Sequence, residues 1–224
     1  MVPTHSLIRF LSAANPLTDF RALPRNELMP ITYTNRKGFI FYLCKGVTKT
    51  SKPRYYFARE PKGEPVEQIP AWVVISESVN GVVSLTKARP MLILPEEIAA
   101  VQAAVQRHRK SRNYRVNIKN DKIVVYERVG ADVDDVLAVF KGEVLISPDK
   151  VEQLQERLDR GAQFTPVLRF ILLDAEARTF HVQRWCYLGS IDDWIDVGPM
   201  GPLGRLARQW IPKLGTYALF EVVF

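Results

Sequence analysis

The chain has 224 residues, of which 47% are hydrophobic and 25% are charged, and it contains only two cysteines, Cys44 and Cys186. This composition excludes a disordered chain, a collagen-like repeat and a disulfide framework, and its apolar runs are far shorter than the roughly 20 residues of a membrane-spanning helix. We therefore expect a globular, cytoplasmic protein that makes no membrane contact.

The formal net charge of +7 is unevenly distributed along the chain. Residues 1–129 contain 21 Lys and Arg against 10 Asp and Glu, whereas residues 130–224 contain 10 against 14. Such asymmetry indicates that the first part of the chain meets an anionic partner and that the second part does not.

Residues 1–28 differ from the sequence that follows them. They mix apolar and polar residues without a sustained period and are interrupted by Pro3, Pro16 and Pro24. We expect an N-terminal arm, or an extension that lies upstream of the true start. A transit peptide is less favoured because the amphipathic pattern is poor.

Residues 29–129 are expected to form a basic, β-rich subdomain with one helix. Asn80-Gly81 indicates a short hairpin, because both residues tolerate positive φ, and Pro95 favours the start of the helix. The expected strands are a meander of four followed by a further hairpin: Phe39–Cys44, Arg54–Arg59, Trp72–Ile75, Val82–Leu85, Tyr114–Lys119 and Ile123–Arg128.

Residues 130–224, beyond a break near Gly130, are expected to form an acidic α+β subdomain. Its best-defined helix starts at Ser147-Pro148, has an apolar stripe and ends near Gly161. The stripe consists of Val151, Leu154 and Leu158. Before this helix lies an ambiguous segment compatible with an interrupted strand, Val136–Ile146. The elements expected after it are a hairpin (Val167–Leu173 and Thr179–Leu188), a short helix (Pro202–Leu214) and a terminal strand (Tyr217–Phe224).

Together these elements predict an α+β fold. Its sheets should be mostly antiparallel, arranged as meanders and hairpins, with two or three helices packed on them.

The segment Asn35–Gly63 is unusually rich in cations and aromatic rings. Its 29 residues hold eight basic side chains, six aromatic ones and a single acid, Glu60. Cations neutralise phosphates and aromatic rings stack on unpaired bases, so the pattern is typical of nucleic-acid contact. The alternative interpretation is that the rings are core residues and the cations the solvated face of an antiparallel sheet.

A second basic segment, Arg107–Lys122, holds seven Lys and Arg against Asp121. If it lies beside the first segment, the two form one basic stripe. If it does not, it is a solvated helix terminus and loop, where cations are favoured by the helix dipole.

Catalytic and metal chemistry has weaker support. The three histidines are isolated from one another, and the chain has no GxSxG elbow and no P-loop. Asp192, Asp193 and Asp196 could hold Mg²⁺, but they surround Trp194 in what reads as a turn, where aspartates are common. We expect neither a metal nor another cofactor.

The leading hypothesis is a non-catalytic protein that binds nucleic acid, DNA or RNA. One alternative is a protein–protein interaction module that docks a basic partner through its acidic C-terminal half, and another is a Mg²⁺-dependent phosphoryl-transfer enzyme. Within the leading hypothesis, Tyr42 and Tyr56 stack on bases, and the phosphates are contacted by Lys45, Lys49, Lys52, Arg54, Arg59, Arg107, Arg109 and Arg112.

Overall fold

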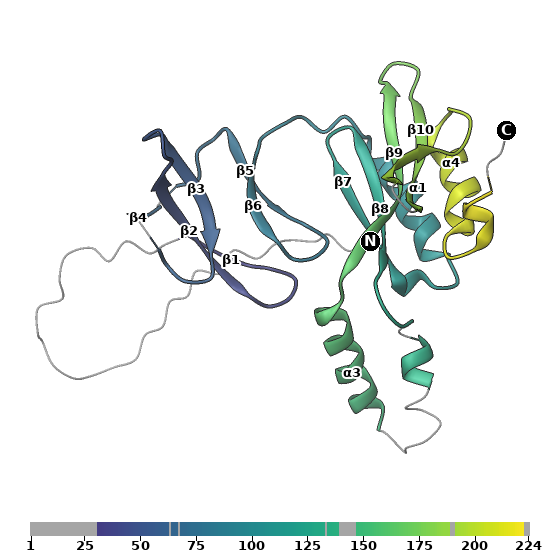
Figure 1. Ribbon diagram of the computed structural model, residues 1–224, viewed down its shortest axis with the longest axis horizontal. Coiled ribbons are helices and arrows are strands. Elements are labelled where there is room, and N and C mark those ends of the chain that lie inside the picture. The colour runs from purple at the N-terminus through teal and green to yellow at the C-terminus, as the bar shows by residue number, and fades with distance from the viewer. Residues whose placement is uncertain are drawn as a thin grey trace, which may run out of the picture. The chain divides into compact units, whose positions relative to one another are not determined.

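The computed structural model describes residues 31–62, 64–66, 68–132, 134–138, 147–188 and 191–221. The predicted N-terminal arm, most of the ambiguous segment before Ser147 and the last residues of the predicted terminal strand lie outside this range. Within it, antiparallel sheets and helices form the α+β fold that the sequence predicts (Figure 1). No helix in these residues is long and apolar enough to cross a membrane.

The chain divides into two compact units. Among the described residues, the first unit takes 31–76 and Val83–Thr86, and the second takes Glu77–Val82 and the chain from Lys87 onward. Gly130, where the sequence suggests a break, lies within the second unit.

The first unit is built around one antiparallel sheet in the order β1-β2-β3, with β4 paired to β2 (Figure 1). A separate two-stranded sheet, β5-β6, has its tip assigned to the second unit. The strands are β1 (Thr32–Thr34), β2 (Ile40–Val47), β3 (Pro53–Ala58), β4 (Glu64–Pro65), β5 (Val73–Glu77) and β6 (Val83–Lys87).

Three hairpin turns in the described residues share one hydrogen-bond pattern. In the β1–β2 turn, the Asn35 amide donates to the Phe39 carbonyl, the Gly38 amide donates to the Asn35 carbonyl, and the Phe39 amide donates to Asn35 Oδ1, each at 2.9 Å. Gly38 has a φ of 79°, a conformation that favours glycine. The same pattern recurs in the β2–β3 turn, with Thr48, Ser51 and Lys52, and in the β5–β6 turn, with Ser78, Gly81 and Val82.

The β5–β6 hairpin forms as predicted, but its turn differs from the two-residue Asn-Gly type. Gly81 has positive φ (79°), whereas Asn80 does not. Instead, the Asn80 side chain donates to the Phe164 carbonyl (3.0 Å) and accepts from the Phe164 amide (2.8 Å). Asn80 is therefore held by a residue 84 positions away rather than by its own turn.

The second unit is a five-stranded antiparallel sheet in the order β11-β10-β9-β8-β7 (Figure 1). Because β8 pairs with β9, this sheet continues across Gly130. The strands are β7 (Tyr114–Lys119), β8 (Lys122–Arg128), β9 (Phe164–Asp174), β10 (Thr179–Leu188) and β11 (Ile191–Asp196).

Helices α1 (Pro95–Gln106) and α4 (Leu203–Trp210) pack against one face of this sheet. The buried core between them includes Val101 of α1, Trp210 of α4 and Phe170 of β9. A bidentate ion pair between Arg178 and Glu97 joins the β9–β10 turn to the first turn of α1, where Glu97 also accepts the Leu94 amide (2.8 Å). We refer to the helix-covered side as the inner face.

Helix α3 (Pro148–Gly161) has the start and the end that the sequence predicts. Its stripe of Val151, Leu154 and Leu158 is only half-buried, although the sequence predicts a buried stripe.

Two further segments are helical. Tyr217–Leu219, expected to open a strand, is a 3₁₀ helix, and a helix over residues 134–138 includes the first three residues of the ambiguous segment Val136–Ile146. Two other 3₁₀ helices lie at Ser111–Asn113 and Ile211–Lys213.

His108 lies just beyond α1 and is buried. The edge of its ring meets the Tyr114 ring at a centroid distance of 4.9 Å, and its Nδ1 accepts the Lys110 amide (3.2 Å). Burial lowers the pKa of His108 below its usual value of 6.5, because the charged form loses hydration.

We expect His108 to make the fold less stable in acid. The unfolded chain takes up a proton near pH 6.5 while the folded protein keeps His108 neutral. Its contribution is therefore complete above that pH and is lost as the pH falls toward the lowered folded pKa. In urea denaturation between about pH 7.5 and 5, His108→Gln should flatten the decrease in unfolding free energy. An unchanged pH dependence would contradict this role.

Candidate nucleic-acid interface

The residues predicted to contact nucleic acid lie in two units. Lys45, Lys49, Lys52, Arg54, Arg59 and the two tyrosines belong to the first unit, whereas Arg107, Arg109 and Arg112 belong to the second. Each group is therefore a surface of its own unit.

Positive charge is concentrated in the smaller unit. Residues 31–76 and 83–86 contain eight Lys and Arg against three Asp and Glu. Residues 77–82 and 87–224 contain 20 against 19 and are nearly neutral. The first unit therefore keeps a net positive charge, whereas the positive residues of the second unit are balanced by the acidic residues of its later part.

The register of β2 and β3 divides the predicted residues between two faces. Gly46 pairs with Arg54 and Cys44 with Tyr56, so Arg54, Tyr56 and Tyr42 share one face, which we call the Tyr56 face. Lys45 pairs with Tyr55 on the opposite face, which we call the Lys45 face. Alternation along the strand therefore separates Lys45 from both candidate stacking tyrosines.

The Tyr56 ring is held in place on its face by backbone contacts. A β-carbon at Gly46 would come within 3.3 Å of the ring, so the absence of a side chain there lets the ring lie against β2. The Tyr56 hydroxyl donates to the Lys62 carbonyl (3.3 Å), and the Lys62 amide donates to Cys44 Sγ (3.4 Å). Tyr56 remains half-buried, so part of its surface is open to solvent.

On the Lys45 face, Arg59 stacks on two aromatic rings. Its guanidinium carbon lies 3.8 Å from the Phe39 ring centroid and 5.0 Å from that of Phe41, and Phe39 is 42% exposed. A stacked guanidinium keeps its in-plane N–H groups available for a phosphate. Arg59 was identified from the sequence as a candidate contact, but the two rings beneath it were not. The spacing of Phe39 and Phe41, which puts both rings on one face of the strand, could have indicated them.

The exposed end of the β2–β3 hairpin carries Lys49, Lys52 and Arg54. All three side chains are exposed, and within the described part of the chain no carboxylate forms an ion pair with any of them. The loop that holds the two lysines is shaped by the Thr48 hydroxyl, which accepts the Lys52 amide (3.1 Å).

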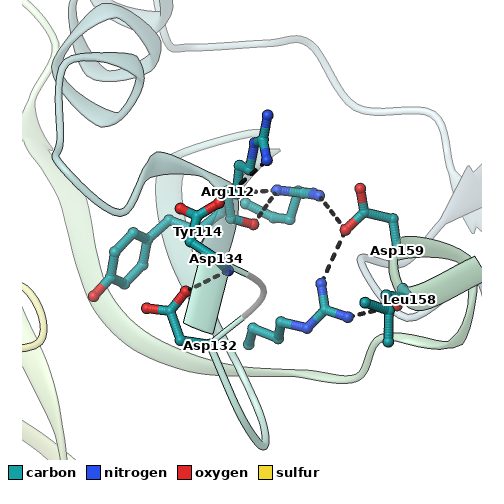
Figure 2. Close-up of polar contacts among 8 residues, drawn as sticks. Arg112, Tyr114, Asp132, Asp134, Leu158 and Asp159 are labelled. Carbon is teal, nitrogen blue, oxygen red and sulfur yellow. Dashed lines mark hydrogen bonds and ion pairs between the residues drawn. The ribbon is translucent and has the colours of Figure 1, made fainter. Parts of the chain in front are cut away.

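Several cations of the second unit are paired with aspartates, and Figure 2 includes Arg112 and Asp134. Lys110 pairs with Asp132 (2.6 Å) and Arg112 with Asp134 (3.2 Å), while the Asp134 amide donates to Asp132 Oδ1 (2.9 Å). The hydrogen bond from Lys110 lowers the pKa of Asp132. Arg107 and Arg109 are exposed.

Asp159 at the end of α3 joins two arginines from the sheet (Figure 2). Its Oδ1 lies 2.9 Å from Arg128 Nη1 and 3.7 Å from Arg115 Nη2. Arg128 also donates to the Leu158 carbonyl (2.5 Å), and Arg115 donates to the Tyr114 carbonyl (2.9 Å). These arginines hold the helix end against the strands, a role that the sequence did not suggest because 31 residues separate Arg128 from Asp159.

The aspartates considered for Mg²⁺ lie on β11 rather than in a turn. Because side chains alternate, Asp192 and Asp196 share a face while Asp193 lies on the other. In the part of the chain that the structure describes, no group of three His, Cys, Asp or Glu side chains is placed to hold a metal ion.

Comparisons with protein families, with curated proteins and with solved structures find no match to this chain.

Asp159→Asn should destabilise the protein by about 1–3 kcal/mol, because it leaves the buried Arg128 side chain without its carboxylate. Asp134→Asn is the matched control. Its pair with Arg112 is half exposed and should contribute about 0–1 kcal/mol. The two losses can be compared by urea denaturation followed by tryptophan fluorescence, and equal losses would show that Asp159 does not anchor the helix.

Proposed function

We propose that this protein is a non-catalytic nucleic-acid-binding protein, and that the end of its β2–β3 hairpin contacts the phosphate backbone. One observation supports this proposal above the others: Lys49, Lys52 and Arg54 lie within six residues, are exposed, and have no carboxylate partner in the described residues. Cations clustered without counter-charges attract a polyanion and release its bound counterions.

The second unit provides a contrast that favours this hairpin. Lys110, Arg112, Arg115 and Arg128 are each paired with an aspartate of the same unit. A phosphate bound there competes with those aspartates. The same pairing weakens the alternative of an acidic docking surface, because Asp132, Asp134 and Asp159 are already engaged with cations.

The other predicted residues make contacts of their own, each from the surface on which it lies. Tyr42 and Tyr56 stack on bases on the same face as Arg54, while Lys45 and Arg59 contact phosphates from the Lys45 face. Arg107 and Arg109 contact phosphates from the second unit. Arg112 joins them by exchanging Asp134 for a phosphate, at low cost because exposed ion pairs contribute about 0–1 kcal/mol.

Changing Lys49, Lys52 and Arg54 together to Ala should weaken binding and reduce its dependence on salt. The logarithm of affinity falls with the logarithm of salt concentration by about 0.9 per phosphate contact on duplex and about 0.7 on single strands. The slope should therefore become shallower by roughly two to three units. Fluorescence anisotropy with labelled single-stranded and duplex DNA and RNA measures this slope and identifies the preferred nucleic acid.

The matched control replaces three exposed cations of α3, Lys150, Arg157 and Arg160, with Ala. It lowers the net charge equally, so it should reduce affinity only slightly and leave the slope within about one unit of the original. Equal effects of the two triple variants would reduce the interaction to net charge. An unchanged slope in the hairpin variant would refute the proposed interface.

Tyr56→Ala should weaken single-strand binding by about 1–3 kcal/mol and affect duplex binding less, because stacking needs an unpaired base. Tyr56→Phe keeps the ring and loses only the hydroxyl that bonds to Lys62, so it should bind like the unaltered protein. Tyr55→Ala is the control from the opposite face. If Tyr55→Ala weakens binding more than Tyr56→Ala, the bases stack on the Lys45 face instead.

A further inference from the structure

Arg184 lies in the middle of β10 at a position where its neighbours are apolar. Val182 and Cys186, two residues to either side, are buried on the inner face of the five-stranded sheet. The residues paired with Arg184 on the adjacent strands are Leu168 and Ile195, which pack in or against the same core. Arg184 itself is only 4% exposed. A guanidinium therefore occupies a core position.

The charge of this guanidinium has no counter-charge among the described residues. Arg184 Nη1 is fully buried without a hydrogen-bond acceptor, and no carboxylate pairs with the side chain in this part of the protein. The other buried arginine side chain of this sheet, that of Arg128, has both a carboxylate and a carbonyl as partners. Arg184 is thus an exception within its own unit.

An arginine side chain does not lose its proton under physiological conditions, so the counter-charge has to come from another group. Buried charges in proteins are normally paired, since burial without a partner is strongly unfavourable. Among the described residues, the guanidinium contacts the ring of Phe220, whose centroid lies 4.9 Å from the guanidinium carbon. An aromatic ring attracts a cation but carries no net charge, so it does not neutralise the guanidinium.

Phe220, the ring that contacts Arg184, is itself partly open to solvent. It follows the 3₁₀ helix Tyr217–Leu219, is 54% exposed, and is preceded by Leu219, which is buried in the core. An anion that entered there would reach a fork of N–H donors that matches the two oxygens of a carboxylate or phosphate.

We propose that Arg184 anchors a binding site for an oxyanion, either a free ion or the carboxylate or phosphate group of a small ligand, beneath Phe220. This site lies in the second unit and does not depend on nucleic-acid binding by the first.

The test is a titration of the full chain with inorganic phosphate and, separately, with acetate, at an ionic strength held constant with sodium chloride. The thermal midpoint of the unaltered protein should rise with the logarithm of anion concentration above Kd, by roughly 3–6 °C at ten times Kd. Non-specific salt effects change the midpoint in proportion to concentration and act on every variant alike. The anion that produces the logarithmic rise at the lower concentration identifies the ligand class as phosphate or carboxylate.

Variants assign the response to this residue. Arg184→Met should abolish the logarithmic rise and, in chloride buffer alone, melt above the unaltered protein because it removes an unpaired buried charge. Arg208→Met, which removes an exposed arginine of α4, should keep the logarithmic rise. If Arg184→Met does not fold, Arg184→Lys tests the same point, because losing the bidentate fork should weaken the apparent affinity about tenfold.

Three results would overturn the proposal. The first is no logarithmic rise of the melting temperature of the unaltered protein with either anion. The second is the same response in Arg184→Met, or in Arg184→Lys, as in the unaltered protein. The third is a lower melting temperature of Arg184→Met in chloride buffer, which would show that the chain already neutralises this charge. Two variants test internal sources of the counter-charge: Glu221→Gln, next to Phe220, and Asp193→Asn, which is paired with Cys186 and so shares the Arg184 face. A destabilisation in either variant equal to that of Arg184→Met would assign the partner to that carboxylate instead of a ligand.

Discussion

Side chains along an antiparallel strand point alternately to the two faces of the sheet, and this alternation decides which charges in the protein can act together. In β2 and β3 it separates Lys45 from Arg54 and the two tyrosines. In β10 it puts Arg184 on the inner face between residues that would otherwise form an unbroken apolar row. In β11 it separates Asp193 from its acidic neighbours. A cluster of like residues in the sequence therefore becomes a cluster in space only where a loop or a shared face joins its members.

Whether the cations of a basic cluster are paired with carboxylates matters more for the role of that cluster than how many cations it contains. The basic segment Arg107–Lys122 is denser in cations than the β2–β3 hairpin, yet three of its charges, on Lys110, Arg112 and Arg115, meet aspartates from later in the chain. The Arg112–Asp134 pair is exposed enough to contribute little to stability, whereas the contacts of Arg128 with α3 join a helix to a sheet. Lys49, Lys52 and Arg54 of the hairpin lack such partners among the described residues. The denser cluster is thus partly neutralised within its own unit, and the sparser one leaves its field open to solvent.

Local patterns predicted the elements well where the determining contacts are themselves local. The α+β class, the hairpins and both ends of α3 follow from apolar periodicity, turn residues and a Ser-Pro start. Strand β11 could not be read this way, because Asp192, Asp193 and Asp196 disfavour strands and only pairing with β10 outweighs that preference. The two-residue turn type predicted at Asn80 does not form for a similar reason, because the Asn80 side chain hydrogen-bonds to the distant backbone of Phe164. At the candidate interface, the sequence located the cations but not the rings under Arg59 or the aspartates opposite Arg112 and Arg128.

A charge without a partner has a different meaning at the surface and in a core, and this protein contains both cases. Water solvates Lys49 and Lys52, so the absence of a carboxylate leaves them free to exchange ions and favours weak, salt-dependent contacts with a polyanion. Arg184 has no such solvent, and any species that neutralises it must reach a guanidinium that is 4% exposed. The signal for Arg184 is in the sequence: Phe180, Val182 and Cys186 repeat every second residue, and the arginine occupies the one remaining place in that row. A cation at an apolar strand position is accordingly a stronger indication of a defined ligand than a run of exposed cations, because its burial tolerates few ways of compensating the charge.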